Sequence, residues 1–302
     1  MERPPKAAAD LDHTRRLVHV GGKTPHRFTW HDRKEVWVNR VVLTMKWGKA
    51  YAADYVNVLY GGVKAHLPGE FRFVCLTDDP TGIRPEVECI PIPDMGLPAR
   101  GFTSGAWPKI AVFKPKLDGL PGRALFIDLD SMICGDLTAM FDQPGRLIMI
   151  HEWLRPIDRI KWNPPVRGAS GVFAFTFDDL AEVHDSLAKD PNHWVATIQN
   201  DQRFMEHIIP NRAFWPETWV RSFKRHVLPG PGLNWFMKPG LPPAGCKVLA
   251  FHGRPRPAEL VPDMGQRWGD FWRSGRGAVP WFRQYWLENG GRDGVIQEIG
   301  PR

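Results

Sequence analysis

The 302-residue sequence contains only four cysteines, which lie far apart, and it has no long apolar run. Without a C-x-x-C pair, the cysteines argue against a zinc ribbon and against a thioredoxin-type redox site. No stretch reaches the roughly 18 apolar residues that a membrane-spanning helix requires, and the first residues lack the apolar core of a signal peptide. These absences favour a protein of the reducing cytoplasm.

The overall composition is that of an ordinary folded domain. Hydrophobic residues make up 43% and charged residues 24% of the chain, which excludes collagen, general disorder and a disulfide-stapled miniprotein. The 29 glycines and 29 prolines follow no period and indicate many structured loops. The net charge of +7 favours an anionic partner such as a nucleotide, a phosphate or an acidic membrane surface.

Residues 1–34 are rich in proline, histidine and basic residues, so we expect an N-terminal arm followed by a single domain over residues 35–302. Apolar runs then alternate with helical periods, which is typical of β-α-β units with a mostly parallel sheet. Ligands of such sheets bind beyond the carboxyl ends of the strands. The expected strands are VWVNRVVLTM, FRFVCLTDD, VECIPIP, ALFIDLD, GVFAF and KVLAF; the expected helices span about 52–63, 107–115, 178–188 and 201–209.

Aromatic residues gather late in the sequence and indicate a C-terminal helical segment. Core packing of that helix is the leading interpretation. The alternative is an interfacial platform for anionic lipid or a glycan acceptor, because arginines alternate with the rings. The aromatic residues are Trp268, Phe271, Trp272, Trp281, Phe282, Tyr285 and Trp286, and the arginines are Arg267, Arg273, Arg276 and Arg283.

The most informative motif is LFIDLDSMICGDL, in which Asp128 and Asp130 close the most apolar strand. Residues i and i+2 of an extended chain point the same way, so both carboxylates can face one cation. Hard oxygen ligands suit Mg²⁺ or Mn²⁺ carrying a phosphate. The alternative is a turn in which one aspartate caps and the other is solvated. The position at the carboxyl end of a buried strand favours the metal site.

This motif resembles the D-x-D segment of nucleotide-sugar glycosyltransferases with the GT-A fold. The segment KVLAFHGRPRP resembles the H-F-x-G-x-x-K-P ending of the glycogenin-like, family 8 group. That resemblance implies that His252 is the third metal ligand and that Gly253 lies at the diphosphate. Arg254 or Arg256 would stand in for the lysine of that group.

Three shorter segments resemble the same enzymes in the same order along the chain. WPKIAVFKP matches the segment that supplies a lysine to the donor, here Lys109. GASGVFAF matches the strand that lines the sugar pocket, with Ser170 and Gly171, and NDQRFM matches a D-Q helix start, with Asp201 and Gln202. The resemblance implies an α/β, GT-A-like (Rossmann-like) fold with a mixed, mostly parallel sheet flanked by helices. It places the donor half in residues 35–142 and the acceptor half, with the C-terminal segment, in 143–302.

The charges of these residues also fit the chemistry of sugar transfer, apart from the resemblance. Breaking a sugar–diphosphate bond develops negative charge on the leaving phosphate and positive charge at the anomeric carbon, so cations are needed at one end and carboxylate or carbonyl oxygen at the other. Asp201, in the first turn of a predicted helix, would be kept ionised by the helix dipole as a nucleophile or cation stabiliser. The alternative is a plain N-capping carboxylate.

Other candidates lie at the ends of the first two strands, and Tyr51 opens the helix that follows the first strand. Thr44 is a candidate for the base or ribose, Lys46 for the phosphate, and Tyr51 for stacking on uracil. Asp78 is a candidate for the ribose or base. The alternatives are ordinary helix packing for Tyr51 and turn capping for Asp78.

The leading hypothesis is transfer of a sugar from a nucleotide diphosphate sugar, a UDP-sugar, to an unidentified glycan, lipid or protein acceptor with Mn²⁺ or Mg²⁺. The family 8 resemblance implies retention of configuration. No nucleic-acid partner is expected, and peripheral contact with an anionic membrane stays open. The rival enzyme is a haloacid-dehalogenase-type phosphatase, although Ser131-Met132 stands where that family expects Gly-Thr. A non-catalytic basic module for RNA or glycan leaves the D-x-D and His-Gly segments unexplained.

Overall fold

The computed structural model describes residues 39–153, 160–163, 165–230, 233, 236–263, 265–270 and 274–294, and every structural statement concerns these residues. The expected N-terminal arm, residues 1–34, lies outside them, as do Phe271, Trp272 and Arg273 of the aromatic segment. The chain from Trp37 onward forms one compact unit.

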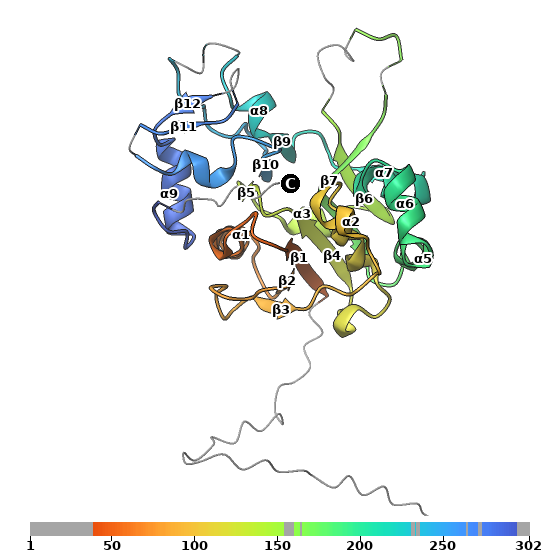
Figure 1. The fold of residues 1–302 in the computed structure, drawn as a ribbon. Coiled ribbons are helices and arrows are strands. Elements are labelled where there is room, and N and C mark those ends of the chain that lie inside the picture. Colours follow the sequence, from red (N-terminus) through yellow and green to blue (C-terminus); the bar gives the residue numbers. More distant parts are fainter. Residues whose placement is uncertain are drawn as a thin grey trace, which may run out of the picture. The chain divides into compact units, whose positions relative to one another are not determined.

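A seven-stranded sheet in the order β3-β2-β1-β4-β7-β6-β8 forms the centre of the described residues (Figure 1). All neighbouring strands are parallel except at β7, which is antiparallel to both β4 and β6. The prediction of a mixed, mostly parallel sheet is confirmed. The strands are β1 (Arg40–Lys46), β2 (Arg72–Thr77), β3 (Glu88–Ile90), β4 (Arg123–Ile127), β6 (Leu147–His151), β7 (Gly168–Thr176) and β8 (Ala213–Phe214).

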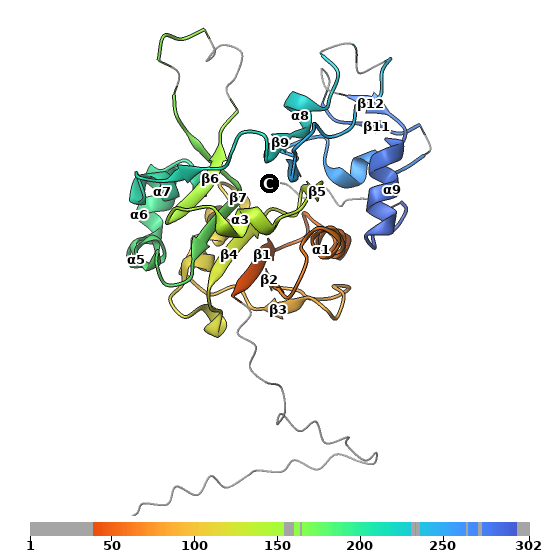
Figure 2. The same cartoon turned by 180° about the vertical axis from the view of Figure 1, so that it is seen from behind.

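Helices cover both faces of this sheet (Figures 1 and 2). Along β4, Leu125 and Ile127 pack into the cluster that contains α1 and α9, while Ala124 and Phe126 pack into the cluster under η1, α5 and α7. A strand buried on both faces reads as a continuous apolar run, as this one does. The helices are α1 (Ala53–His66), α2 (Ala99–Thr103), η1 (Trp107–Phe113), η2 (Leu117–Gly119), α3 (Thr138–Asp142), α5 (Ala181–Lys189), α6 (Pro191–Thr197), α7 (Asp201–Ile208), α8 (Phe223–His226), η4 (Pro257–Leu260) and α9 (Pro280–Glu288).

The helix expected from Trp107 is a 3₁₀ helix, η1, and all of its residues are buried. Pro108 occupies the first turn, as expected, and the helix ends at Phe113, just before Pro115. A short segment that is buried all round gains its stability from packing on the sheet, so helical propensity does not decide its geometry.

A second, three-stranded sheet joins the two motifs that are most distant in sequence. It contains β5 (Ser131–Ile133), β10 (Val248–Ala250) and β9 (Val220–Ser222). β5 follows Asp130 directly and runs antiparallel to β10, with Ser131 opposite Ala250. The backbone N–H of Phe251 then donates to the carbonyl of Asp130 over 2.9 Å. The D-x-D segment and the His-Gly segment are therefore neighbours.

The C-terminal aromatic segment belongs to the core. A short hairpin of β11 (Arg267–Trp268) and β12 (Gly275–Arg276) precedes α9. Trp268, Phe282 and Trp286 are each 1% exposed, and the Ile133 N–H donates to the Tyr285 hydroxyl over 3.1 Å. The core-packing interpretation is confirmed for these residues, and an interfacial platform built from their rings is ruled out by their burial.

Among the described residues, no helix has both the length and the hydrophobicity to cross a bilayer.

Candidate functional site

Four polar side chains, of which three are buried and Asp128 is partly exposed, form a row at the carboxyl edge of the central sheet. Because β7 runs against β4, its first residues lie beside the last residues of β4, and the Asp128 N–H donates to the Gly171 carbonyl over 2.8 Å. Lys109 of η1 contacts the Asp128 carboxylate and, at 3.4 Å, the Ser170 carbonyl. The Ser170 hydroxyl donates to Asp201 of α7 over 2.7 Å. The structure thus brings together residues that the sequence predicts on four separate segments.

Lys109 and Asp128 form an ion pair within this row. The Lys109 Nζ lies 2.7 Å from each oxygen of the carboxylate. The lysine side chain is 7% exposed and that of Asp128 is 27% exposed. Burial on its own would lower the pKa of Lys109, but the carboxylates of Asp128 and Asp201 outweigh it and hold that pKa above its ordinary value. Lys109 is therefore a fixed cation.

Asp201 is the first residue of α7, but it does not cap the helix. The cap is Asn200, whose side-chain oxygen accepts from the Arg203 N–H over 3.0 Å. The N-capping alternative for Asp201 is therefore wrong. Burial raises the pKa of Asp201 to about 6, although Lys109 and the Ser170 hydrogen bond oppose the rise. The sequence predicts that the helix dipole determines the ionisation of Asp201, but burial has the larger effect. With a pKa of about 6, the carboxylate is still largely ionised at neutral pH.

Asp130 is held by a tyrosine that the sequence connects with the nucleotide base. The Tyr51 hydroxyl donates to an Asp130 carboxylate oxygen over 3.0 Å. The Arg256 guanidinium lies 5.0 Å from the Tyr51 ring centroid and donates to the Ala50 carbonyl over 2.9 Å. Burial and the Asp130 charge raise the pKa of Tyr51 well above its ordinary value, so it remains a donor. Stacking of Tyr51 on uracil stays a prediction.

The two arginines proposed for the lysine of the resembled motif have different surroundings. Arg254 pairs with Glu259 over 3.0 Å and is 44% exposed, whereas Arg256 is buried above Tyr51. Arg256 is thus the one directed towards the D-x-D segment. Gly253, which follows His252 directly, has a φ of +69°. A Cβ added to this glycine would lie 3.1 Å from the Lys224 Nζ. A side chain at this position would be strained.

His252 follows β10 and contacts two residues that the sequence did not single out. Its Nε2 lies 2.8 Å from the Ser222 hydroxyl oxygen, in hydrogen-bond contact. The Trp153 ring stacks on the imidazole, with centroids 5.6 Å apart and planes 21° apart. Within the described ranges, no group of three or more His, Cys, Asp or Glu side chains is arranged to hold a metal ion. Asp128, Asp130 and His252 lie on adjoining segments without forming such a group.

The candidates on β1 and β2 are tied into the protein itself. Thr44 is fully buried and its hydroxyl donates to the Ile127 carbonyl over 2.8 Å, so we leave it out of the proposed site. The Lys46 ammonium donates to the Asp79 carbonyl over 3.2 Å. Asp78 accepts from the Gly48 N–H over 2.8 Å and thereby joins the ends of β1 and β2. Nucleotide contacts of Lys46 and Asp78 stay predictions.

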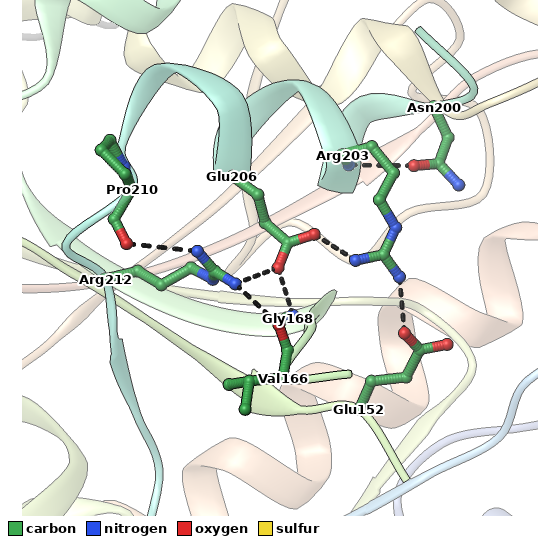
Figure 3. A network of polar contacts seen from close by, with 8 residues as sticks. All are labelled: Glu152, Val166, Gly168, Asn200, Arg203, Glu206, Pro210 and Arg212. Atoms are coloured by element: carbon green, nitrogen blue, oxygen red, sulfur yellow. Dashed lines mark hydrogen bonds and ion pairs between the residues drawn. The ribbon is translucent and has the colours of Figure 1, made fainter. Parts of the chain in front are cut away.

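A network of ion pairs holds the helix that carries Asp201 (Figure 3). Glu206 of α7 accepts from Arg203 and Arg212 and from the Gly168 N–H at the start of β7. Arg203 also contacts Glu152, 2.5 Å away, at the end of β6. Because Ser170 is two residues beyond Gly168, the network fixes the spacing between Ser170 and Asp201.

No protein-family model and no curated protein matches the sequence. Solved structures do match. The galactosyltransferase LgtC, in complex with donor and acceptor sugar analogues, is 13% identical over 85% of this chain and 98% of its own, with a TM-score of 0.53. The bifunctional glycosyltransferase WbbM is 13% identical over 87% of this chain and 51% of its own (TM-score 0.52). GlyE of Streptococcus pneumoniae TIGR4 is 12% identical over 83% and 61% (TM-score 0.50). The chain therefore has the GT-A glycosyltransferase fold, as predicted.

Proposed function

We propose that this protein is a glycosyltransferase that moves a sugar from a nucleotide diphosphate sugar, a UDP-sugar, to a carbohydrate, lipid or protein acceptor. The observation that carries the proposal is the hydrogen-bonded row of Lys109, Asp128, Ser170 and Asp201 at the carboxyl edge of a GT-A sheet, in which only Asp128 is partly exposed. Ligands of open α/β sheets bind at this edge. LgtC, whose structure holds donor and acceptor sugar analogues, shares the fold.

The charges of the row suit the two ends of a breaking sugar–diphosphate bond. Lys109 and Arg256 are buried cations beside the D-x-D segment, and they would stabilise the negative charge of the leaving diphosphate. Asp201 is a buried carboxylate on the far side of Ser170, and it would stabilise the positive charge at the anomeric carbon or attack it. Gln202, the next residue of α7, is the second catalytic candidate. Residues 35–142 would bind the donor and residues 143–302 the acceptor, with retention of configuration.

Asp128, Asp130 and His252 would hold Mn²⁺ or Mg²⁺. Their oxygen and imidazole donors suit Mn²⁺, and the hydrogen bond between Phe251 and Asp130 makes the two segments neighbours. The bound ion would supply Lewis-acid stabilisation of the leaving phosphate. Tyr51 would orient the Asp130 carboxylate, and Ser222 and Trp153 would orient the His252 ring.

The function is tested by a donor screen that measures hydrolysis of several UDP- and GDP-sugars with Mn²⁺, beside phosphate release from generic phosphomonoesters. We expect turnover of one nucleotide sugar and no phosphate release. The phosphatase alternative predicts the reverse pattern, and a non-catalytic module predicts neither activity.

The metal site gives a separate prediction for Asp130→Ala. We expect the variant to lose Mn²⁺-dependent binding of UDP and to keep its fold, because Asp130 is partly exposed and contributes little packing. Calorimetric titration of UDP with and without Mn²⁺ measures the effect. Asp136→Ala is the matched control: this exposed carboxylate in the same segment accepts from the Thr138 N–H and hydroxyl and has no part in the proposed site. Equal UDP affinity in wild type and Asp130→Ala would remove Asp130 from the site.

A further inference from the structure

The segment between β6 and β7 exposes apolar side chains to an unusual degree. Ile160 is 79% exposed, Trp162 is 103% exposed and Val166 is 62% exposed. Lys161 and Arg167, on the same segment, are also exposed. We call these five residues the loop surface. Large apolar side chains gathered on one protruding segment mark an interaction site, because isolated exposed residues need no explanation but clusters do.

The loop surface lies at the functional edge of the sheet. β6 ends at the carboxyl edge of the sheet and β7 begins there, and in Figures 1 and 2 the coloured part of the connection between them projects from the side on which α8 lies. The chain that follows α8 exposes more apolar side chains, with Phe236 87% and Leu241 70% exposed. At the base of the loop, Trp153 stacks on His252. The connection that carries the loop surface therefore begins beside the site.

We propose that the loop surface docks on an anionic lipid bilayer, with Ile160 and Trp162 inserted among the lipid headgroups. The charge of the described residues is complementary: among residues 160–163 and 165–167, Lys161 and Arg167 are basic and none is acidic, which gives +2, and the whole chain carries +7. Apolar side chains that alternate with cations are the composition of interfacial membrane anchors. Tryptophan is favoured at the bilayer interface because it joins a large apolar ring to an N–H donor.

The exposure itself favours lipid over a folded protein partner. Residues that line a pocket or groove for a protein partner are partly shielded from solvent by their neighbours. The Trp162 side chain, in contrast, is fully exposed to solvent. A projecting segment of this kind can enter a deformable headgroup layer without a matching cavity on the other side. Docking here would turn the edge that holds Asp128 and Asp201 towards the lipid surface.

The experiment is co-sedimentation of the full chain with vesicles of phosphatidylcholine alone or mixed equally with phosphatidylglycerol. We expect binding to the anionic vesicles, and we expect Trp162→Glu to weaken it by about tenfold or more, since a large apolar side chain leaves the lipid. Arg167→Glu should weaken binding by more than about fivefold, which is the effect of one cation near such a surface. The substituted residues are exposed, and circular dichroism checks the fold.

Two matched controls separate lipid docking from general effects. Leu287→Glu places the charge on a 36% exposed leucine of α9. Lys114→Glu reverses the charge of an exposed cation at the opposite edge of the sheet. This edge is identified by the neighbouring Lys116, whose N–H donates to Asp178 just after β7. Both controls should bind vesicles as the wild type does. The proposal is overturned if the wild type does not bind anionic vesicles, or if Trp162→Glu binds them as well as the wild type. A loop surface that contacts a protein or a glycan would give one of these two results. The test uses no sugar donor, so its result is independent of the proposed activity.

Discussion

Replacing Asp201 with asparagine is expected to lower turnover by on the order of 10² or more, while the affinity for the nucleotide sugar changes little. Positive charge appears at the anomeric carbon only as the sugar–phosphate bond lengthens, so a carboxylate aimed there acts on the transition state and not on the bound donor. Asparagine retains an oxygen that can accept from the Ser170 hydroxyl, which donates to Asp201 over 2.7 Å. The substitution therefore removes the charge and leaves the local packing.

The same variant has a defined pH signature. Burial raises the pKa of Asp201 to about 6, above the ordinary carboxyl value near 4, so the ionised form costs stability. Below about pH 4 this cost is absent; it grows between about pH 4 and 6, where only the unfolded chain is ionised, and is constant above that range, on the order of 3 kcal/mol. We expect kcat/KM of the wild type to rise through about pH 6, and we expect Asp201→Asn to lack this limb and to be no less stable at pH 7.

The control for Asp201 is its neighbour. Asn200→Ala removes the N-cap of α7 and should cost about 1 kcal/mol of stability with little effect on turnover at saturating donor. Steady-state kinetics, donor titration and urea unfolding of the two variants separate the roles. If Asp201→Asn is as active as the wild type, Asp201 is not catalytic.

Much of the fold follows from periodicity in the sequence. The apolar run at β4 and the helical spacing from Ala52 onward predict their elements within a few residues, because both are buried along a full strand or a full helix face. The direction of β7 could not be predicted in this way, since its apolar pattern is the same whichever way the strand runs. The 3₁₀ geometry at Trp107 depends on packing against the sheet and carries no pattern of its own.

The site, like the fold, contains residues that the sequence predicts and others that only the structure reveals. Asp128 follows the most apolar strand, so a rule about strand ends finds it. Lys109 and Ser170 lie within η1 and β7, and they were predicted through the resemblance to glycosyltransferases, as was Asp201 at the start of α7. Glu152 and Trp153 follow the apolar run LIMIH and obey the same rule, but this strand was not among those expected. Ser222 belongs to a strand of three residues, too short to show a period. The contact of Arg256 with Tyr51 joins residues over 200 positions apart, and only the folded chain reveals it.

Lys109→Met is expected to destabilise the protein by about 3 kcal/mol, the lower end of the range for breaking a buried ion pair, because Asp128 keeps some contact with solvent. Without this ammonium, Asp128 loses both of its 2.7 Å contacts and faces Asp201 with no cation between them. Turnover should also fall, since the leaving diphosphate loses a fixed positive charge. Urea unfolding at pH 7 measures the stability change.

A double-mutant cycle shows whether the loss comes from the ion pair. Adding Asp128→Asn to Lys109→Met should recover part of the stability, because the uncompensated carboxylate is then neutral, whereas two independent sites would give additive losses. The pair of Arg72 and Glu88 has the same 2.7 Å separation but is more open to solvent, with side chains 30% and 42% exposed, so Arg72→Met should cost no more than about 1 kcal/mol. If Lys109→Met is as mild as Arg72→Met, the carboxylates of the row are solvated or protonated without Lys109, and the lysine is not the cation that holds the site together.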